Sequence, residues 1–125
     1  MKCLVLGGAG FIGSHVADSL IEAGHKVTVV DHLSTGKRAN LNPKAKFFHD
    51  DIEDSGLWAK LGKHHFVYHL AARARIQPSI KHPVRTHNTN VNGTLNVLEY
   101  CRKHQAKLIF SGSSSIYKGE KLPTK

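Results

Sequence analysis

A glycine-rich turn near the N-terminus has the residue types and the spacing needed to hold linked phosphates. Residues 7–13 read Gly-Gly-Ala-Gly-Phe-Ile-Gly, which satisfies both the G-x-G-x-x-G and the G-x-x-G-x-x-G spacing. A side chain at the early glycines would stop the backbone from turning sharply and approaching a pyrophosphate. One at Gly13 would hold the next helix away from the preceding strand. The start of that helix offers unpaired N–H groups and a positive dipole end to phosphates. The spacing therefore predicts a dinucleotide-binding turn.

The turn lies between the two elements that such a site requires. Residues 4–6 are an apolar strand segment, and the residues after the turn fit a helix that ends at Gly24. We expect the apolar face of this helix to consist of Ile12, Val16, Leu20 and Ala23. Because tight turns collect glycine for purely structural reasons, the strand-turn-helix context is what favours a dinucleotide site over a plain turn.

A carboxylate follows the second predicted strand. Residues 26–30 form a β-branched run typical of a buried parallel strand, and Asp31 comes directly after it, 18 residues beyond Gly13. A carboxylate here can accept hydrogen bonds from the ribose hydroxyls of adenosine and would repel a 2′-phosphate, which favours NAD over NADP. Lys37 and Arg38 follow closely and leave the NADP alternative open, and an acid at the start of a loop is also common in itself.

The third strand is predicted at residues 45–49, after a polar, turn-rich loop over residues 32–44. Asp50, Asp51 and Ile52 follow, where an acid could accept from the exocyclic amine of an adenine and an aliphatic side chain could pack on its ring. Alternatively, Asp50 or Asp54 caps the helix predicted after it, at residues 55–61, and for Asp54 we prefer this capping role.

The fourth strand is predicted at residues 65–70, and two alanines follow it. Small residues just past a strand end permit a ligand to approach, so Leu70, Ala71 and Ala72 are expected under the cofactor. Arg73 and Arg75 come next, in a loop that Pro78 and Pro83 close. They could meet a substrate phosphate or lie on the surface.

A long helix is predicted at residues 84–104 and a fifth strand at residues 107–111. The apolar side of the helix is expected at Val91, Leu95, Leu98, Tyr100 and Cys101. Near its start, we expect Asn90 to bond to the backbone of a neighbouring element and Thr89 to reach the nicotinamide ribose. Five strands alternating with helices predict an α/β fold, a doubly wound, Rossmann-like parallel sheet of order 3-2-1-4-5.

Chain length, hydropathy and cysteine content limit the classes of protein to which the sequence can belong. A chain of 125 residues makes one domain, and the sequence has neither a membrane-spanning run nor an N-terminal signal, so we expect a cytoplasmic protein. Cys3 and Cys101 are expected to be buried, reduced thiols.

The net charge is +9, from 18 Lys and Arg against 9 Asp and Glu. The basic residues are dispersed, apart from a denser tail at Lys118, Lys121 and Lys125, and aromatic residues do not interleave with them. We therefore expect no nucleic-acid partner. His64 and His65 adjoin on opposite faces of a strand, without a Cys or carboxylate cluster, so no metal is expected.

Several stretches together resemble the extended short-chain dehydrogenase/reductase superfamily and, within it, the NAD-dependent nucleotide-sugar epimerases similar to UDP-glucose 4-epimerase. The resemblance covers essentially the whole chain. It is carried by residues 7–15 (GGAGFIGSH), 31–36 (DHLSTG), 51–52 (DI), 69–72 (HLAA), 90–99 (NVNGTLNVLE) and 113–117 (SSSIY).

The resemblance implies an NAD site and an isomerase chemistry. The residues that would contact the pyrophosphate are Gly7, Gly10, Phe11, Ile12 and Gly13, and those that would contact the adenosine ribose are Asp31, His32, Leu33, Ser34, Thr35 and Gly36. The adenine would contact Asp51 and Ile52. The central and nicotinamide parts would contact Leu70, Ala71, Ala72 and Thr89. In such enzymes the bound NAD takes a hydride from C4 of a UDP-sugar and returns it to the other face, with a Ser or Thr, a Tyr and a Lys as catalytic residues. Ser113 matches the catalytic serine.

The sequence departs from the family at the catalytic Tyr and Lys. In the family these lie on a helix further along the chain. Tyr117 and Lys121 spell Tyr-x-x-x-Lys, but Lys118 to Pro123 has loop composition and cannot place both side chains on one helix face. Ser114 and Ser115 stand where dehydratases carry an Asp-Glu pair and decarboxylases a Glu, which favours epimerisation.

We therefore expect residues 1–125 to be the NAD-binding domain of an epimerase-like chain, truncated before the substrate-binding part and inactive alone. Whether the chain is itself an enzyme is left open. The alternatives are a free-standing NAD-binding module, one half of a split enzyme, or a dehydratase or reductase of the same superfamily. Relatives dimerise through two helices, of which the 84–104 helix is one, so a homodimer through this helix is a further expectation.

Overall fold

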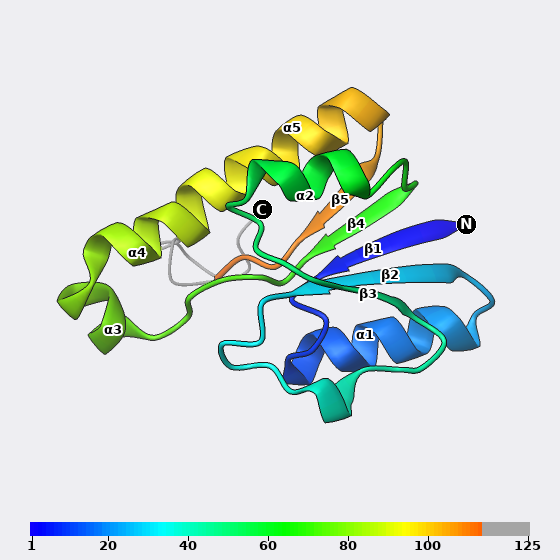
Figure 1. Cartoon of the computed structure of the whole chain (residues 1–125), viewed down its shortest axis with the longest axis horizontal. Helices are drawn as coiled ribbons and strands as arrows, with labels where there is room; N and C mark the ends of the chain where they lie inside the picture. Colours follow the sequence, from blue (N-terminus) through cyan, green and yellow to red (C-terminus); the bar gives the residue numbers. More distant parts are fainter. Residues whose placement is uncertain (114–125) are drawn as a thin grey trace, which may run out of the picture.

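Five parallel strands form one sheet with helices on both faces (Figure 1). The computed structural model describes residues 1–113. The sheet order is β3-β2-β1-β4-β5, every neighbouring pair is parallel, and the predicted topology is confirmed. In chain order the strands are β1 (Lys2–Leu6), β2 (Lys26–Asp31), β3 (Lys46–His49), β4 (Phe66–His69) and β5 (Lys107–Phe110).

The helices separate into two layers. Figure 1 shows α1 (Phe11–Glu22) on one face of the sheet and α2 (Ser55–Lys60) and α5 (Thr94–His104) on the other. A short 3₁₀ turn, η1 (Arg38–Asn40), interrupts the loop between β2 and β3. Over residues 1–113, no helix has the length and hydropathy that a membrane crossing needs.

The core consists of two apolar layers that β1 divides between its faces. Leu4 and Leu6 pack with residues of α2 and α5, such as Leu57 and Val97, whereas Cys3 and Val5 pack toward α1. β1 is buried on both sides, as expected for the central strand of a doubly wound sheet. Cys3 and Cys101 are free and buried, as predicted, and burial raises the pKa of both thiols.

The apolar face predicted for α1 is only partly correct. The buried residues are Gly13, Ser14 and Ala17, whereas Ile12 is 62% exposed and Ala23 is also exposed. The helix approaches β1 closely, and only small side chains fit into that contact. As predicted, Gly24 closes the helix, which ends at Glu22: Gly24 has φ +88°, which favours glycine, and its N–H donates to the Ile21 carbonyl.

The helix predicted at residues 84–104 is a composite of three segments. An α-helix α4 (Pro83–His87) leads into a π-helical segment η2 (Asn88–Gly93) and then into α5. The predicted apolar side is correct for two of its five residues: Tyr100 and Cys101 are buried, while Val91, Leu95 and Leu98 are about half exposed. The three segments α4, η2 and α5 together carry two apolar stripes, one packed against the sheet and one facing away from it.

Two further local predictions are corrected. The segment after Arg75 is not a continuous loop, because α3 (Ile76–Lys81) forms there with Pro78 in its first turn, where a missing N–H costs nothing. His64 and His65 precede β4 instead of lying in it. Across residues 1–113 no group of three potential metal ligands occurs.

His64 is a buried, hydrogen-bonded core residue. It is 4% exposed, its Nδ1 lies 2.8 Å from the Tyr100 hydroxyl, and its Nε2 lies 3.0 Å from Thr28 Oγ1. Tyr100 donates to the Gly62 carbonyl at 2.5 Å, so Nδ1 donates to the Tyr100 oxygen and Thr28 donates to Nε2. Burial, with a smaller contribution from the Lys2 ammonium, lowers the pKa of His64 to about 4, and burial raises the pKa of Tyr100 to about 12.

This pKa predicts a loss of stability in mild acid. The unfolded chain binds a proton at His64 near pH 6.5 and the folded chain only near pH 4, so the contribution is full above 6.5 and disappears as the pH falls toward 4. From pH 7 to pH 5, His64 alone is expected to lower the free energy of unfolding by about 2 kcal/mol. Burial also lowers the pKa of His69, which adds a loss of the same sign.

Urea unfolding at the two pH values measures this effect. The His64→Gln variant is expected to be less stable at pH 7 and to show a smaller pH dependence, whereas His65→Gln, which removes the exposed neighbour, is expected to keep the wild-type dependence. An unchanged pH dependence in His64→Gln would contradict the assignment.

Candidate functional site

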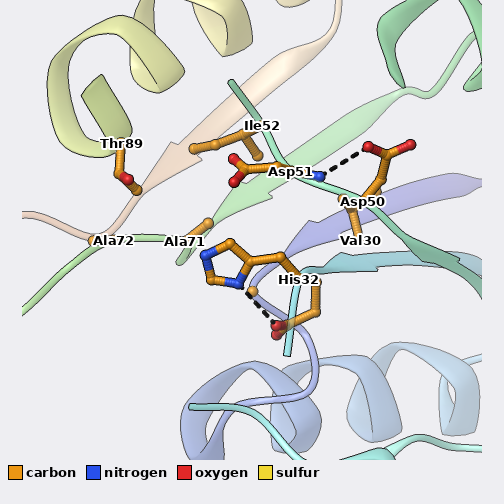
Figure 2. A pocket seen from close by; sticks show the side chains of 10 residues that line it. Val30, His32, Asp50, Asp51, Ile52, Ala71, Ala72 and Thr89 are labelled. Atoms are coloured by element: carbon orange, nitrogen blue, oxygen red, sulfur yellow. Dashed lines mark hydrogen bonds and ion pairs between the residues drawn. The ribbon is translucent and has the colours of Figure 1, made fainter. Parts of the chain in front are cut away.

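A hollow opens at the edge of the sheet where β1, β2, β3 and β4 end (Figure 2). Ligands of open α/β sheets bind at this edge, where the strand order reverses on the two sides of β1. The lining consists of Gly7, Val30, Asp31, His32, Asp50, Asp51, Ile52, Ala71, Ala72 and Thr89. Most of these residues were predicted from the sequence as site residues. Val30 was not, because its place in an apolar strand predicts only a core residue.

The loop that connects β1 to α1 contains several sterically required glycines, among them Gly7 and Gly13. Gly7 has φ +83°, and a Cβ there would lie 2.9 Å from the Ala71 nitrogen. A Cβ on Gly13 would lie 2.1 Å from the Gly7 carbonyl oxygen, which is far inside contact distance. The loop therefore packs against the end of β4 on one side and against its own helix on the other.

Gly10 is different, because no nearby atom requires it to be glycine. Its φ is −77°, and the single contact that a Cβ would make is with the Gly7 oxygen, at 3.4 Å. The first helical bond of α1 runs from Ser14 N–H to the Gly10 carbonyl, and the part of the chain that the structure describes holds no backbone partner for the N–H groups of residues 11–13. Space and three N–H groups thus coincide at a helix start, which fits the pyrophosphate of a dinucleotide.

Asp31 holds the glycine loop to the end of β2. One carboxylate oxygen accepts from Ala9 N–H at 2.9 Å, and the other accepts from Leu33 N–H at 2.8 Å. The second bond stabilises Leu33 at φ +62°, a region that a leucine rarely adopts. Each oxygen keeps a further lone pair, so the carboxylate is fixed in place and can still accept from a ribose hydroxyl. Sequence analysis assigned Asp31 only the contact with the ligand.

The loop after Asp31 folds back onto Ala9. Lys37 N–H and the Asn40 side-chain amide both donate to the Ala9 carbonyl, at 3.0 and 2.9 Å. The Arg38 guanidinium lies 5.5 Å from the centre of the Phe47 ring and 3.4 Å from His49 Nδ1. Arg38 thereby contacts side chains of β3, and among the described residues it forms no ion pair with Asp31.

The acids after β3 have separate roles. Asp50 forms an ion pair with Lys60 at 3.0 Å, and this contact lowers the pKa of the Asp50 carboxyl. Asp51 accepts from Glu53 N–H at 2.9 Å, and Asp54 caps α2 by accepting from Gly56 N–H, as predicted. In Figure 2, Asp51 and the buried Ile52 line the wall opposite His32.

The floor of the hollow is held by hydrogen bonds between the segment after β4 and the π-helical segment. Asn90 accepts from the backbone N–H of Arg73 at 2.8 Å and donates to its carbonyl at 3.0 Å, which confirms the prediction for Asn90. Thr89 is 3% exposed; its hydroxyl accepts from Arg73 Nε at 2.9 Å and donates to Glu53 at 3.2 Å. Glu53 was missed, because a charged residue that pairs across 36 positions leaves no local sequence pattern.

The other predicted residues lie around this hollow without lining it. Phe11 and Ile12 are exposed at the start of α1, and Ser113 is exposed three residues after the end of β5. Ser114, Ser115, Tyr117 and Lys121 are outside the described residues. The remainder belong to the glycine loop, to the loop after β2 and to the end of β4: Gly10, Gly13, Leu33, Ser34, Thr35, Gly36 and Leu70.

Comparison with known proteins identifies the relatives of this chain. The model of the family described as "NAD dependent epimerase/dehydratase family" matches residues 3–124. A UDP-glucose 4-epimerase from Lactobacillus helveticus is 41% identical over 121 residues, which are 94% of this chain and 37% of that protein. The crystal structure of a UDP-glucose 4-epimerase from Thermotoga maritima with UDP-glucose has a TM-score of 0.87 and 47% identity, over 90% of this chain and 38% of that one.

A second solved structure is of a UDP-glucose 4-epimerase from Thermus thermophilus in complex with NAD. It has a TM-score of 0.83 and 39% identity, and the match covers 90% of this chain and 38% of that one. The present chain thus spans somewhat less than two-fifths of the length of these relatives.

Proposed function

The chain belongs to the NAD dependent epimerase/dehydratase family, and we propose that it is the NAD-binding portion of a nucleotide-sugar epimerase. The observation that carries this proposal is the geometry at Gly10. Its missing side chain leaves open space beside a helix start, and the adjacent Ala9 bonds to Asp31. Similarity to UDP-glucose 4-epimerases supports a UDP-sugar as the substrate of the complete family member.

Four groups of residues would each contact a different part of the cofactor. The N–H groups at the start of α1, with Gly7 and Gly13, hold the pyrophosphate, and the fixed Asp31 carboxylate with the loop to Gly36 holds the adenosine ribose. Asp51 and Ile52 flank the adenine. The segment from Leu70 to Ala72 contacts the central part, where Thr89 contributes shape, because its hydroxyl already bonds to Arg73 and Glu53.

The bound NAD would supply a hydride acceptor that oxidises C4 of the sugar and then reduces it from the opposite face. Ser113 follows β5 at the edge of the sheet where the other strands end, and we propose that it is the serine that contacts the reacting sugar hydroxyl. We do not assign Tyr117 and Lys121 as the proton-transferring pair. We therefore expect a protein made of these 125 residues to bind NAD without converting sugars.

Isothermal titration calorimetry with NADH and NADPH tests the binding proposal. We expect one NADH per chain and weaker binding of NADPH, because Asp31 disfavours a 2′-phosphate. No heat with either nucleotide would contradict the proposal. Interconversion of UDP-glucose and UDP-galactose by the purified 125-residue chain would contradict the expected inactivity.

The exposed apolar stripe on α4, η2 and α5 supports a homodimer. Val84, Val91, Leu95 and Leu98 are 47–70% exposed along these three segments, and apolar stripes of this kind mark interfaces. Sedimentation velocity is expected to show a dimer that Leu95→Glu dissociates, whereas Ser19→Glu, at an exposed position of α1 on the other face of the sheet, leaves it intact. A wild-type monomer at high concentration would contradict the homodimer.

A further inference from the structure

Five lysines gather around one hollow at the edge of the sheet where the strands begin. We call it the lysine hollow; its charged lining consists of Lys2, Lys26, Lys44, Lys46 and Lys63. His25 and His64 also line it. Figure 1 shows the strands starting on the side of the molecule where the N-terminus lies, away from the arrowheads at the candidate cofactor site. The basic residues described as dispersed along the sequence therefore converge in space, and the lysine hollow is separate from the cofactor site.

The strand register places like charges side by side. Lys2 of β1 is in register with Lys26 of β2, and Lys46 of β3 is in register with Thr28, two residues further along β2. Side chains in register on neighbouring parallel strands point to the same face, and the strands are about 5 Å apart. Adjacent like charges destabilise a sheet, so this arrangement opposes folding unless something neutralises it.

The described protein supplies no neutralising acid. The lining contains no Asp or Glu. Within residues 1–113 the ion pairs join Lys60 to Asp50, Arg102 to Glu99 and His32 to Asp31, and none involves a lysine of the hollow. A concave surface lined by one sign of charge concentrates the field and attracts counter-ions from solution.

The remaining lining indicates which anion fits. No Phe, Tyr or Trp contributes to it, so the lysine hollow has no platform on which a nucleobase could stack. The lysines of the lysine hollow come from three strands and two connecting segments and surround one concave site, instead of forming a long linear groove. We propose that the lysine hollow binds a compact anion of several linked phosphates through the ammonium groups of these five lysines.

Tripolyphosphate is a suitable probe, used in an NMR titration of the 125-residue chain. NADH is present in excess so that the glycine loop cannot take up the probe. We expect the backbone amides of residues 24–26 and 62–64 to shift, with an affinity that falls at least about tenfold between 50 and 200 mM salt, because several phosphates are neutralised together. Absence of shifts at low salt would overturn the proposal.

The amide map keeps this result distinct from the nucleotide proposal. Shifts confined to residues 7–13 would show that tripolyphosphate binds at the glycine loop and would overturn the lysine hollow as its site. If NADH does not bind at all, shifts at residues 24–26 and 62–64 still support the lysine hollow, because those residues lie at the opposite edge of the sheet.

A matched pair of double variants tests whether position or total charge matters. Lys26→Gln with Lys46→Gln is expected to weaken binding of tripolyphosphate at least about tenfold while the melting temperature stays equal or rises, since a repulsion is relieved. Lys81→Gln with Lys103→Gln removes the same charge from exposed helical positions and is expected to change the affinity less than about threefold. Equal losses in both pairs would overturn a defined site.

An oligonucleotide provides the last comparison. A single-stranded oligothymidylate is expected to bind no more tightly per phosphate than tripolyphosphate, because the lysine hollow offers only charge. Markedly tighter binding of the oligonucleotide, lost in the Lys26→Gln and Lys46→Gln variant, would overturn the compact anion in favour of a nucleic-acid surface.

Discussion

Replacing Gly13 by Ala is expected to destabilise the whole chain. The added Cβ would lie 2.1 Å from the Gly7 carbonyl oxygen and 2.9 Å from the Gly8 Cα, and both are backbone atoms of the turn that α1 must approach. Either the helix or the loop must move, and such overpacking typically costs about 1 to 3 kcal/mol and occasionally more. We expect a loss of about 3 kcal/mol or more in the free energy of unfolding, measured by urea denaturation, with loss of NADH binding.

Gly10→Ala is the matched control for this substitution. It adds the same methyl group three residues earlier, where the nearest atom is 3.4 Å from the added Cβ and φ is −77°. We expect its stability to remain within about 1 kcal/mol of the wild type, while its affinity for NADH falls at least about tenfold because the methyl group occupies space proposed for the pyrophosphate. Equal stability of the two variants would contradict the packing argument, and wild-type NADH affinity in Gly10→Ala would contradict the proposed place of the pyrophosphate.

Replacing Asp31 by Ala is expected to have the largest effect on nucleotide affinity among variants that still fold. The substitution removes the acceptor that fixes Ala9 N–H and Leu33 N–H, and it removes the acceptor proposed for the ribose hydroxyls. Hydrogen bonds to a charged group contribute about 1.5 to 3 kcal/mol each, so we expect the Kd for NADH to rise about 100-fold. Because the repulsion of a 2′-phosphate is also lost, the preference for NADH over NADPH is expected to shrink.

Calorimetry of Asp31→Ala beside Asp18→Ala separates this role from a general loss of negative charge. Asp18 lies on α1 and accepts a hydrogen bond from the Asn42 amide, remote from the hollow. We expect Asp18→Ala to change the affinity for NADH less than about threefold. A similar loss of affinity in both variants, or an unchanged NADH preference in Asp31→Ala, would contradict the role of Asp31.

The sheet and its order could be predicted because their determinants are local. β-branched runs, the glycine turn and the spacing between strands each leave a pattern within a few residues of the chain, and right-handed crossovers then restrict the topology. Asp31 could be placed for the same reason, since it directly follows a strand. Asn90 was predicted correctly because a polar residue on the inner side of a helix must find a partner.

The features that escaped prediction depend on distances that the sequence does not contain. Hydropathy assigned Ile12 to the core, but α1 lies so close to β1 that only Gly13, Ser14 and Ala17 fit between them. The structural bonds of Asp31 and the pairing of Thr89 with Glu53 join residues 22 and 36 positions apart. The lysine hollow likewise arises from strand register, which brings together lysines that look scattered along the chain.

A crystal structure of the chain with NADH tests the central claim most directly. The pyrophosphate is expected at the N–H groups of residues 11–13, beside Gly10, and the adenosine ribose within hydrogen-bond distance of the Asp31 carboxylate. A nucleotide bound at another place, or an Asp31 carboxylate turned away from the ribose, would contradict the claim.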